Sequence, residues 1–210
     1  EYSHDSILYN KEELLYNGKQ CFPRMINNIC SFEPRKQFIN KLIKDIHLEG
    51  RKLLILSDRR DYLSTTLEWI NTNICPAGLY IGGLKPYELR ESQEKDIILG
   101  TFSMASEGMD IPKLNTIILA SPKSDVVQSV GRIMREKAEK RKFHPLIIDI
   151  RDCHPNLTCF EKQSDKRITF YKKQNYTIHK YNIDGSVIKI EKTKRKKKQE
   201  YFETAEYLLE

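Results

Sequence analysis

Five short runs of isoleucine and leucine, most of them separated by helical patterns, constrain the fold of this chain more than any other feature. The runs are "KLLILS" at 52–57, "GLYIGG" at 78–83, "DIILGT" at 96–101, "NTIILAS" at 115–121 and "HPLIIDI" at 144–150. Each has the length of a β-strand, and most are continuously apolar, which is typical of strands buried on both faces. The pattern predicts an α/β fold: a parallel sheet of about five or more strands with helices on both faces.

Helical patterns fill most of the intervals between these runs. In residues 33–50, Leu42 and Ile46 recur at the spacing of one helix face, Pro34 suits the first turn, and Gly50 suits the end. Further helices are expected over 59–73, 85–94 and 125–137. In sheets of this kind the functional residues gather at the carboxyl ends of the strands, in the loops that lead to helices.

The composition and periodicity of the sequence change near residues 30 and 152, so the chain is predicted to have three parts. Residues 1–30 have no clear period, and we expect a connecting arm with room for one short helix. Residues 31–152 hold the sheet. Residues 153–210 form an extension: 167–192 are rich in β-branched and aromatic residues, with Asp184-Gly185 as a hairpin turn. A basic run, "KTKRKKKQ", and a short amphipathic helix, "EYFETAEYLLE", complete the extension.

Several classes of protein are disfavoured by the composition. No apolar run approaches the roughly 20 residues that a membrane-spanning helix needs, and the first residues lack the pattern of a signal peptide. The cysteines are odd in number and irregular in spacing, which favours reduced thiols in a cytosolic or nuclear compartment. Cys153, His154 and Cys159 fit no common zinc spacing, so we expect no metal site.

The net charge is +7, and most of it lies in the extension. Residues 151–210 hold 14 lysines and arginines against 9 acidic residues, whereas the first 150 residues hold 22 against 20. A basic extension favours an anionic partner, and nucleic acid is the most common one. The alternative is a solvated lysine run without a partner.

The loop after the third predicted strand carries small and acidic residues. Gly100-Thr101 ends the strand, and Gly108, Asp110 and Pro112 follow within a dozen residues. Glycine lets a ligand approach the backbone closely, and the aspartate offers an acceptor at the edge of the sheet. Ordinary turn chemistry explains the same residues, and the loop by itself does not separate the two interpretations.

The helix predicted at 125–137 carries a polar stripe. Gln128, Arg132 and Arg135 stand at i, i+4 and i+7 and therefore share one face. The buried face is assigned to Val126, Val127, Val130, Ile133 and Met134. Arginines on a helix usually form a solvated face, but Gly131 costs about 1 kcal/mol there relative to alanine, which indicates a close approach. Guanidinium groups at this edge of a sheet suit the phosphates of a nucleotide.

These motifs resemble those of superfamily 2 helicases. "TFSMASEGMDIP" and "QSVGRIMR" resemble motifs V and VI, and "KLLILSDRR" resembles motif IV. Their order matches the second, C-terminal RecA-like lobe of these motors, over about residues 35–152. The motifs are more similar to those of double-stranded-DNA translocases than to DEAD-box RNA helicases, which usually have a histidine where Gln128 stands. "FYKKQNYTIHKYNID" resembles the C-terminal hairpin of helicases from large cytoplasmic DNA viruses, including the poxvirus transcript-release helicase.

The resemblance implies roles for individual residues. Arg132 and Arg135 would reach the γ-phosphate of ATP, with Arg135 as the arginine finger, and Gln128 would orient that end of the site. Gly108 and Asp110 would line the cleft between two lobes. The track of the nucleic-acid backbone would include Ser57, Arg59, Gly82, Gly83 and Thr101, which can grip phosphates without reading bases.

The aromatic and basic residues of the predicted hairpin have two interpretations. Tyr171 alternates there with Lys172 and Lys173, and Tyr176 and Tyr181 follow. This mixture could bind nucleic acid through stacking and charge. A hairpin that packs its tyrosines against the main domain would give the same pattern.

A phosphate-binding Gly-x-x-x-x-Gly-Lys-Ser/Thr loop is not found; Gly18-Lys19 is followed by Gln20 without a glycine-rich lead. ATP with Mg²⁺ would therefore be held mainly by an N-terminal RecA-like lobe, and we expect negligible ATP hydrolysis by this chain alone. The expected partners are that lobe and double-stranded or partly single-stranded DNA. We expect an intracellular protein, in the host cytoplasm if it is viral. The alternatives are an RNA helicase lobe and a non-catalytic module that binds nucleic acid or a protein partner.

Overall fold

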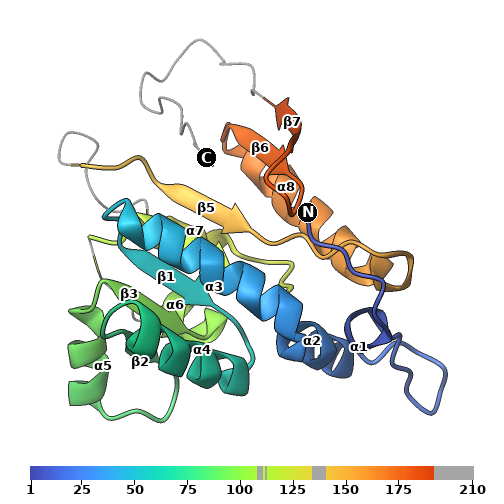
Figure 1. Ribbon diagram of the computed structural model, residues 1–210, viewed down its shortest axis with the longest axis horizontal. Helices are drawn as coiled ribbons and strands as arrows, with labels where there is room; N and C mark the ends of the chain where they lie inside the picture. The colour runs from blue at the N-terminus through green and yellow to red at the C-terminus, as the bar shows by residue number, and fades with distance from the viewer. Residues whose placement is uncertain (108–110, 112, 134–140, 192–210) are drawn as a thin grey trace.

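The computed structural model describes residues 1–107, 111, 113–133 and 141–191. A five-stranded sheet lies at its centre, with the strand order β2-β3-β1-β4-β5 and every pair parallel (Figure 1). The strands are β1 (Leu53–Leu56), β2 (Gly78–Tyr80), β3 (Ile97–Gly100), β4 (Thr116–Leu119) and β5 (Leu146–Asp149). All five runs of isoleucine and leucine are strands, so the predicted parallel sheet is confirmed.

Helices cover both faces of this sheet, as expected. One face packs against α2 (Phe22–Ser31), α3 (Glu33–Leu48) and α4 (Arg60–Asn73), through a cluster that includes Leu53, Ile55 and Leu99. The other face packs against α6 (Phe102–Glu107) and the start of α7 (Val127–Ile133), through a cluster that includes Leu54 and Leu56. Successive strand residues therefore enter opposite cores, which is why these strands are apolar without alternation. At the β2 edge, Leu89 of α5 (Pro86–Gln93) packs against the second cluster.

The N-terminal arm holds two helices, where one short helix was expected. Besides α1 (Ile7–Asn10), the ten-residue α2 buries Met25 and Ile29 completely against α3. The sequence did carry this signal, because Phe22, Met25 and Ile29 follow a helical spacing and Pro23 suits a first helical turn. Tyr2 and Tyr9 are also buried in the core.

The extension begins with a 3-10 turn, η2 (Pro155–Leu157), followed by the long helix α8 (Thr158–Lys173). The strands β6 (Ile178–Tyr181) and β7 (Val187–Glu191) then pair antiparallel around Gly185, which confirms the hairpin turn. The placement of Tyr171, Lys172 and Lys173 on the hairpin was wrong, because all three lie on α8. Burial decides this: Tyr171 packs into the second core cluster, which overrides the weak strand preference of the segment. The predicted basic run and terminal helix lie outside the described residues.

Among the residues that the structure describes, no helix is long and apolar enough to cross a membrane. The same residues contain no group of three or more histidine, cysteine or acidic side chains placed to hold a metal ion.

Candidate nucleotide and nucleic-acid interface

The loops that leave the carboxyl ends of the strands lie side by side, as the parallel topology requires. The N–H of Ser57, directly after β1, donates to the carbonyl of Gly100 at 3.1 Å. The N–H of Asp58 donates to Oγ of Ser121, the second residue after β4, at 3.3 Å. The segments assigned from the sequence to motifs IV and V, and the segment that leads to α7, thus meet at one edge.

Ser57 was expected to contact nucleic acid, but its side chain is fully buried. Its Oγ accepts a hydrogen bond from the N–H of Arg59 at 3.1 Å, so the hydroxyl shapes the loop at the start of α4. Arg59 is half-buried, and its guanidinium donates to the carbonyls of Asp58 at 3.3 Å and Pro23 at 3.5 Å. Arg59 therefore offers a partly exposed positive charge at this edge, whereas the side chain of Ser57 is not accessible.

Gly82 and Gly83 follow β2 and lie near the start of α4. The carbonyl of Gly82 accepts a hydrogen bond from Nη2 of Arg60 at 2.9 Å. Gly83 is exposed and has a φ of +93°, a conformation that favours glycine, so the turn itself explains this residue. Arg60 was missed in the sequence, although it adjoins Arg59 and places a second exposed guanidinium beside the same loops.

Thr101 lies at the start of α6 and is largely buried. Its Oγ1 is 3.3 Å from Oγ of the exposed Ser103, and its carbonyl accepts from the N–H of Ala105 at 3.0 Å. The threonine therefore anchors the first turn of α6, and Ser103 is the hydroxyl that faces solvent.

The polar stripe of α7 is exposed on its described part. Gln128 is exposed, and Nη2 of the half-buried Arg132 donates to the carbonyl of Ser106 in α6. The expectation that Val127 is buried was wrong: it is 51% exposed, whereas Val126 and Val130 of the same described stretch are buried in the core. The remaining predicted residues, Arg135, Gly108 and Asp110, lie outside the described residues.

Gly131 adjoins this stripe and is exposed. Apart from its two chain neighbours and the backbone of the helix itself, no described atom lies within 4 Å of the position that a Cβ would occupy there. Packing within the described part of the chain therefore gives no reason for a glycine in the middle of this helix.

Lys123 was not identified from the sequence, yet it contacts two of the loops at this edge. Its Nζ lies 2.8 Å from Oδ2 of Asp58 and 5.3 Å from the centre of the Phe102 ring. The segment between β4 and α7 is thereby joined to the loop after β1 and to the start of α6. The sequence feature that could have indicated this role is the position of a lysine in the loop after a predicted strand.

Lys172 and Lys173 lie at the C-terminal end of α8, and both are exposed. Nζ of Lys172 lies 2.6 Å from Oε2 of Glu191 in β7. Hydrogen bonds from Lys172 and Lys189 lower the pKa of Glu191 to about 2. The charge of Lys172 is therefore engaged with the hairpin.

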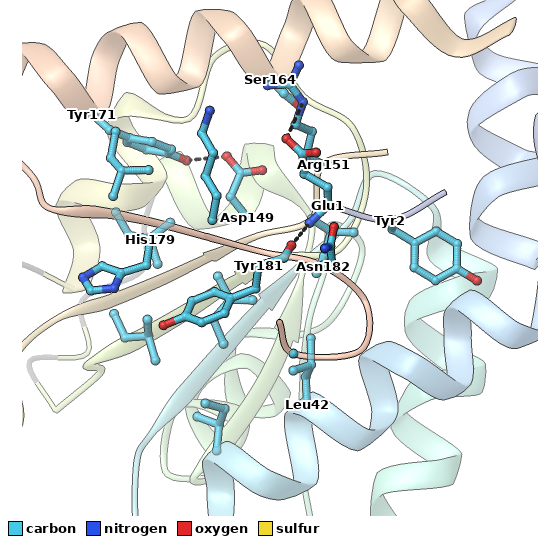
Figure 2. A pocket seen from close by; sticks show the side chains of 18 of the residues that line it. Glu1, Tyr2, Leu42, Asp149, Arg151, Ser164, Tyr171, His179, Tyr181 and Asn182 are labelled. Atoms are coloured by element: carbon cyan, nitrogen blue, oxygen red, sulfur yellow. Dashed lines mark hydrogen bonds and ion pairs between the residues drawn. The ribbon is translucent and has the colours of Figure 1, made fainter. Parts of the chain in front are cut away.

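A cavity of about 550 Å³ lies elsewhere, between α3, β5, α8 and the β6–β7 hairpin (Figure 2). Leu42, Asp149, Tyr171 and His179 are among the residues that line it. Tyr176 and Tyr181 line it as well, but none of the described residues assigned to the helicase motifs does. The candidate site is thus the open edge formed by the loops and α7.

Comparison with known proteins gives a consistent match over the sheet domain. The family model described as "Helicase conserved C-terminal domain" matches residues 35–137. A protein of Acanthamoeba polyphaga mimivirus, L396, is 38% identical over 188 residues, which cover 88% of this chain and 34% of the relative. The African swine fever virus protein QP509L is 29% identical over 136 residues, which cover 64% of this chain and 26% of the relative. The names of both relatives assign them to the ATP-dependent RNA helicases.

The fold comparison agrees. The crystal structure of T4 UvsW has a TM-score of 0.59 and 19% sequence identity, and the match covers 75% of this chain and 36% of that one. At this identity the likeness concerns the fold alone. The chain spans about a third of the mimivirus relative and about a quarter of the African swine fever virus relative.

Proposed function

The chain belongs to the helicase conserved C-terminal domain family of superfamily 2, and from this premise we propose that it is the C-terminal motor lobe of an ATP-dependent helicase or translocase. One observation carries the proposal: α7 presents Gln128 and Arg132 beside the loops after β1 and β3, at the carboxyl edge of a parallel sheet. Ligands of such sheets bind at this edge.

In this proposal a second RecA-like lobe, N-terminal to this one in the full protein, holds ATP and Mg²⁺. Arg132 and Arg135 reach the γ-phosphate when the two lobes close, with Arg135 as the finger, and Gln128 orients the same end of the site. Gly108 and Asp110 line the cleft. Hydrolysis then releases both the nucleotide contact and the grip on the nucleic acid. The isolated chain is expected to turn over ATP negligibly.

The nucleic-acid track in this proposal runs along the loops after β1, β2 and β3. The half-buried Arg59 and the exposed Arg60 supply guanidinium groups, and Gly83 and Ser103 supply exposed backbone and hydroxyl groups. Such groups suit contacts to phosphates that do not depend on sequence. Ser57 and Thr101 act behind this surface, because both are buried and shape the loops.

We propose DNA as the substrate, on the resemblance of the motifs to those of double-stranded-DNA translocases. RNA is the second candidate, favoured by the names of the two viral relatives. Stimulation of ATP hydrolysis by DNA and RNA of equal length separates them, because only the translocated polymer accelerates turnover. Since the relatives come from large DNA viruses, we propose a viral protein that acts inside the host cell.

The finger assignment is tested in a protein that carries both lobes. Arg135→Ala is expected to lower ATP turnover about 10³-fold or more while leaving the Kd for nucleic acid nearly unchanged, because a finger acts mainly in the transition state. Arg90→Ala, which removes an exposed arginine on α5, is the matched control and leaves both quantities unchanged. Equal loss of binding and turnover in Arg135→Ala would contradict the role.

A further inference from the structure

Two buried arginines hold the segment that connects β4 to α7. Arg35 reaches it from α3 and Arg167 from α8, and both side chains are almost inaccessible to solvent. Neither residue belongs to a motif identified in the sequence. Because α7 carries Gln128 and Arg132, whatever fixes its first turn bears on the proposed site.

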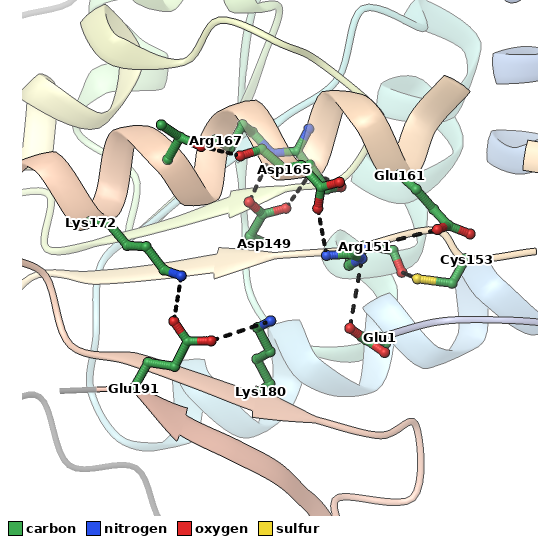
Figure 3. Close-up of polar contacts among 12 residues, drawn as sticks. Glu1, Asp149, Arg151, Cys153, Glu161, Asp165, Arg167, Lys172, Lys180 and Glu191 are labelled. Carbon is green, nitrogen blue, oxygen red and sulfur yellow. Dashed lines mark hydrogen bonds and ion pairs between the residues drawn. The ribbon is translucent and has the colours of Figure 1, made fainter. Parts of the chain in front are cut away.

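Arg167 makes contacts with three partners. Its Nε and Nη2 donate to the two carboxylate oxygens of Asp149, at the end of β5, over 2.8 and 2.6 Å (Figure 3). Its Nη2 also donates to Oγ of Ser164 at 2.7 Å. The remaining Nη1 donates to the backbone carbonyl of Lys123. The guanidinium therefore ties the extension helix, the last strand of the sheet and the β4–α7 segment together.

Arg35 repeats this arrangement from the opposite face of the sheet. Its Nε and Nη2 donate to the two oxygens of Asp152 at 2.7 and 2.9 Å. Its Nη1 donates to the carbonyl of Ala120 at 2.9 Å. Both ends of the short stretch Ala120–Lys123 are thus held by guanidinium groups. Each of these is itself fixed on an aspartate, either at the end of β5 or three residues after it.

The stretch that these arginines hold determines how α7 begins. The side chain of Lys123 contacts Asp58 and Phe102. The position of the Lys123 backbone therefore determines where the β4–α7 segment lies relative to the loops after β1 and β3. Two residues later, Oδ1 of Asp125 accepts from the N–H of Val127 at 3.2 Å, at the first turn of α7. A shift of the Lys123 carbonyl would therefore be transmitted directly to the helix.

Arginine is suited to this task, and lysine is not. The planar guanidinium can bind both oxygens of a carboxylate and keep a donor directed elsewhere, whereas an ammonium is a compact charge that cannot span both partners. Buried ion pairs contribute little net stability compared with apolar side chains of the same volume. Fixed geometry is the better explanation for these two pairs.

We propose that Arg167 and Arg35 are positioning residues of the motor lobe, which hold α7 where Gln128 and Arg132 can act on a phosphate. This inference rests on the proposed function of α7. It also assigns a role to the extension: through Arg167, α8 is part of the geometry of the nucleotide site and not an appended nucleic-acid grip alone.

Hydrogen exchange in this chain tests the positioning without reference to catalysis. In Arg167→Lys, amides of residues 121–133 are expected to exchange about tenfold faster or more, while those of β1 and β3 stay unchanged. Arg151→Lys is the matched control, because the Arg151 side chain also pairs with an acidic residue of α8, Asp165, but its ion pairs in the described structure are with Glu1, Glu161 and Asp165 and not with the β4–α7 segment. Unchanged exchange at 121–133, or equal acceleration across the whole sheet, would overturn the proposal.

Ser164→Ala is a milder variant for the case in which Arg167→Lys does not fold. It removes one hydrogen bond to Nη2 of Arg167 and no charge. The same region is expected to exchange faster, by a smaller factor. A folded Ser164→Ala variant with accelerated exchange only outside residues 121–133 would overturn the proposal.

Kinetics in the protein with both lobes tests the consequence for the reaction. Arg167→Lys is expected to lower kcat for ATP hydrolysis about tenfold, because a small displacement of a catalytic group is costly. KM for ATP and the Kd for nucleic acid are expected to stay within about twofold, and Arg151→Lys is expected to retain kcat. An unchanged kcat in Arg167→Lys would overturn the positioning role. A wild-type protein without ATP hydrolysis would instead overturn the proposed function, and the exchange experiment would still decide whether Arg167 fixes α7.

Discussion

The ion pair between Arg35 and Asp152 has no exposed surface on either side chain. Desolvation of two such charges is offset only when their donors and acceptors are satisfied. Here the aspartate accepts from Nε and Nη2 of Arg35 and also from the hydroxyl of Tyr9 at 3.0 Å. This network joins α3, the first residues of the chain and the segment after β5 into one buried unit.

Removal of one partner of this pair is expected to be costly. Arg35→Leu leaves the carboxylate of Asp152 buried without its cation, which should lower the free energy of unfolding by about 3–5 kcal/mol. The double variant Arg35→Leu/Asp152→Leu should recover a large part of that loss, because no uncompensated charge remains. Urea denaturation of the three proteins measures both effects. A single variant as stable as the wild type would contradict the assignment of this pair as fully buried.

At the scale of single elements, a glycine in β2 and a glycine in α7 have different surroundings. A Cβ on Gly78 in β2 would lie 2.6 Å from the Cα of Ser92, so α5 is pressed directly against this strand. A Cβ on Gly131 in α7 would meet no described atom within 4 Å outside its chain neighbours and the backbone of its own helix. The first glycine is therefore required by packing within the chain, whereas the second is not.

This contrast predicts opposite effects of the same substitution. Gly78→Ala should destabilise the chain by about 1–3 kcal/mol, because backbone must shift. Gly131→Ala should stabilise it by up to about 1 kcal/mol, because alanine is the better helix former. If Gly131 serves the close approach of a phosphate or of the other lobe, Gly131→Ala should nonetheless impair ATP turnover in the two-lobe protein. Thermal unfolding and turnover are the measurements; destabilisation by Gly131→Ala would show that the helix itself needs the glycine.

At the scale of the whole molecule, the charge is concentrated in the extension, and six of the seven residues 192–198 are basic. Deletion of 192–198 is expected to weaken nucleic-acid binding and to reduce the dependence of log K on log salt, by about 0.9 for each lost contact to a DNA phosphate. A variant with these seven residues in scrambled order should bind as the wild type does, because such contacts depend on charge alone. Unchanged binding after the deletion would show that the basic residues among 192–198 do not contact the nucleic acid.

The sequence could predict the elements whose signal is local. Each run of isoleucine and leucine formed a strand, and Asp184-Gly185 formed the hairpin turn, because burial on both faces and a positive φ restrict residue types within a few positions. The same local reasoning failed where distant burial decided the outcome. Tyr171 lies on a helix because it packs into the core and its hydroxyl donates to Asp149 at 3.0 Å, which no nearby residue indicates. Ser57 was expected at the surface because of its motif, but the fold buries it, which no neighbouring residue indicates either.

The sequence by itself thus determined the α/β class, the strands, the hairpin and the resemblance to superfamily 2 helicases, because strand burial and motif spacing are written in consecutive residues. Only the tertiary structure decided which charged residues support the proposed site. Arg35 and Asp152 stand 117 residues apart, and Arg167 lies 44 residues from the carbonyl of Lys123 to which it donates. An ion pair between distant residues leaves no periodicity in the chain, and its partners are chosen only when the sheet brings the ends of β4 and β5 together.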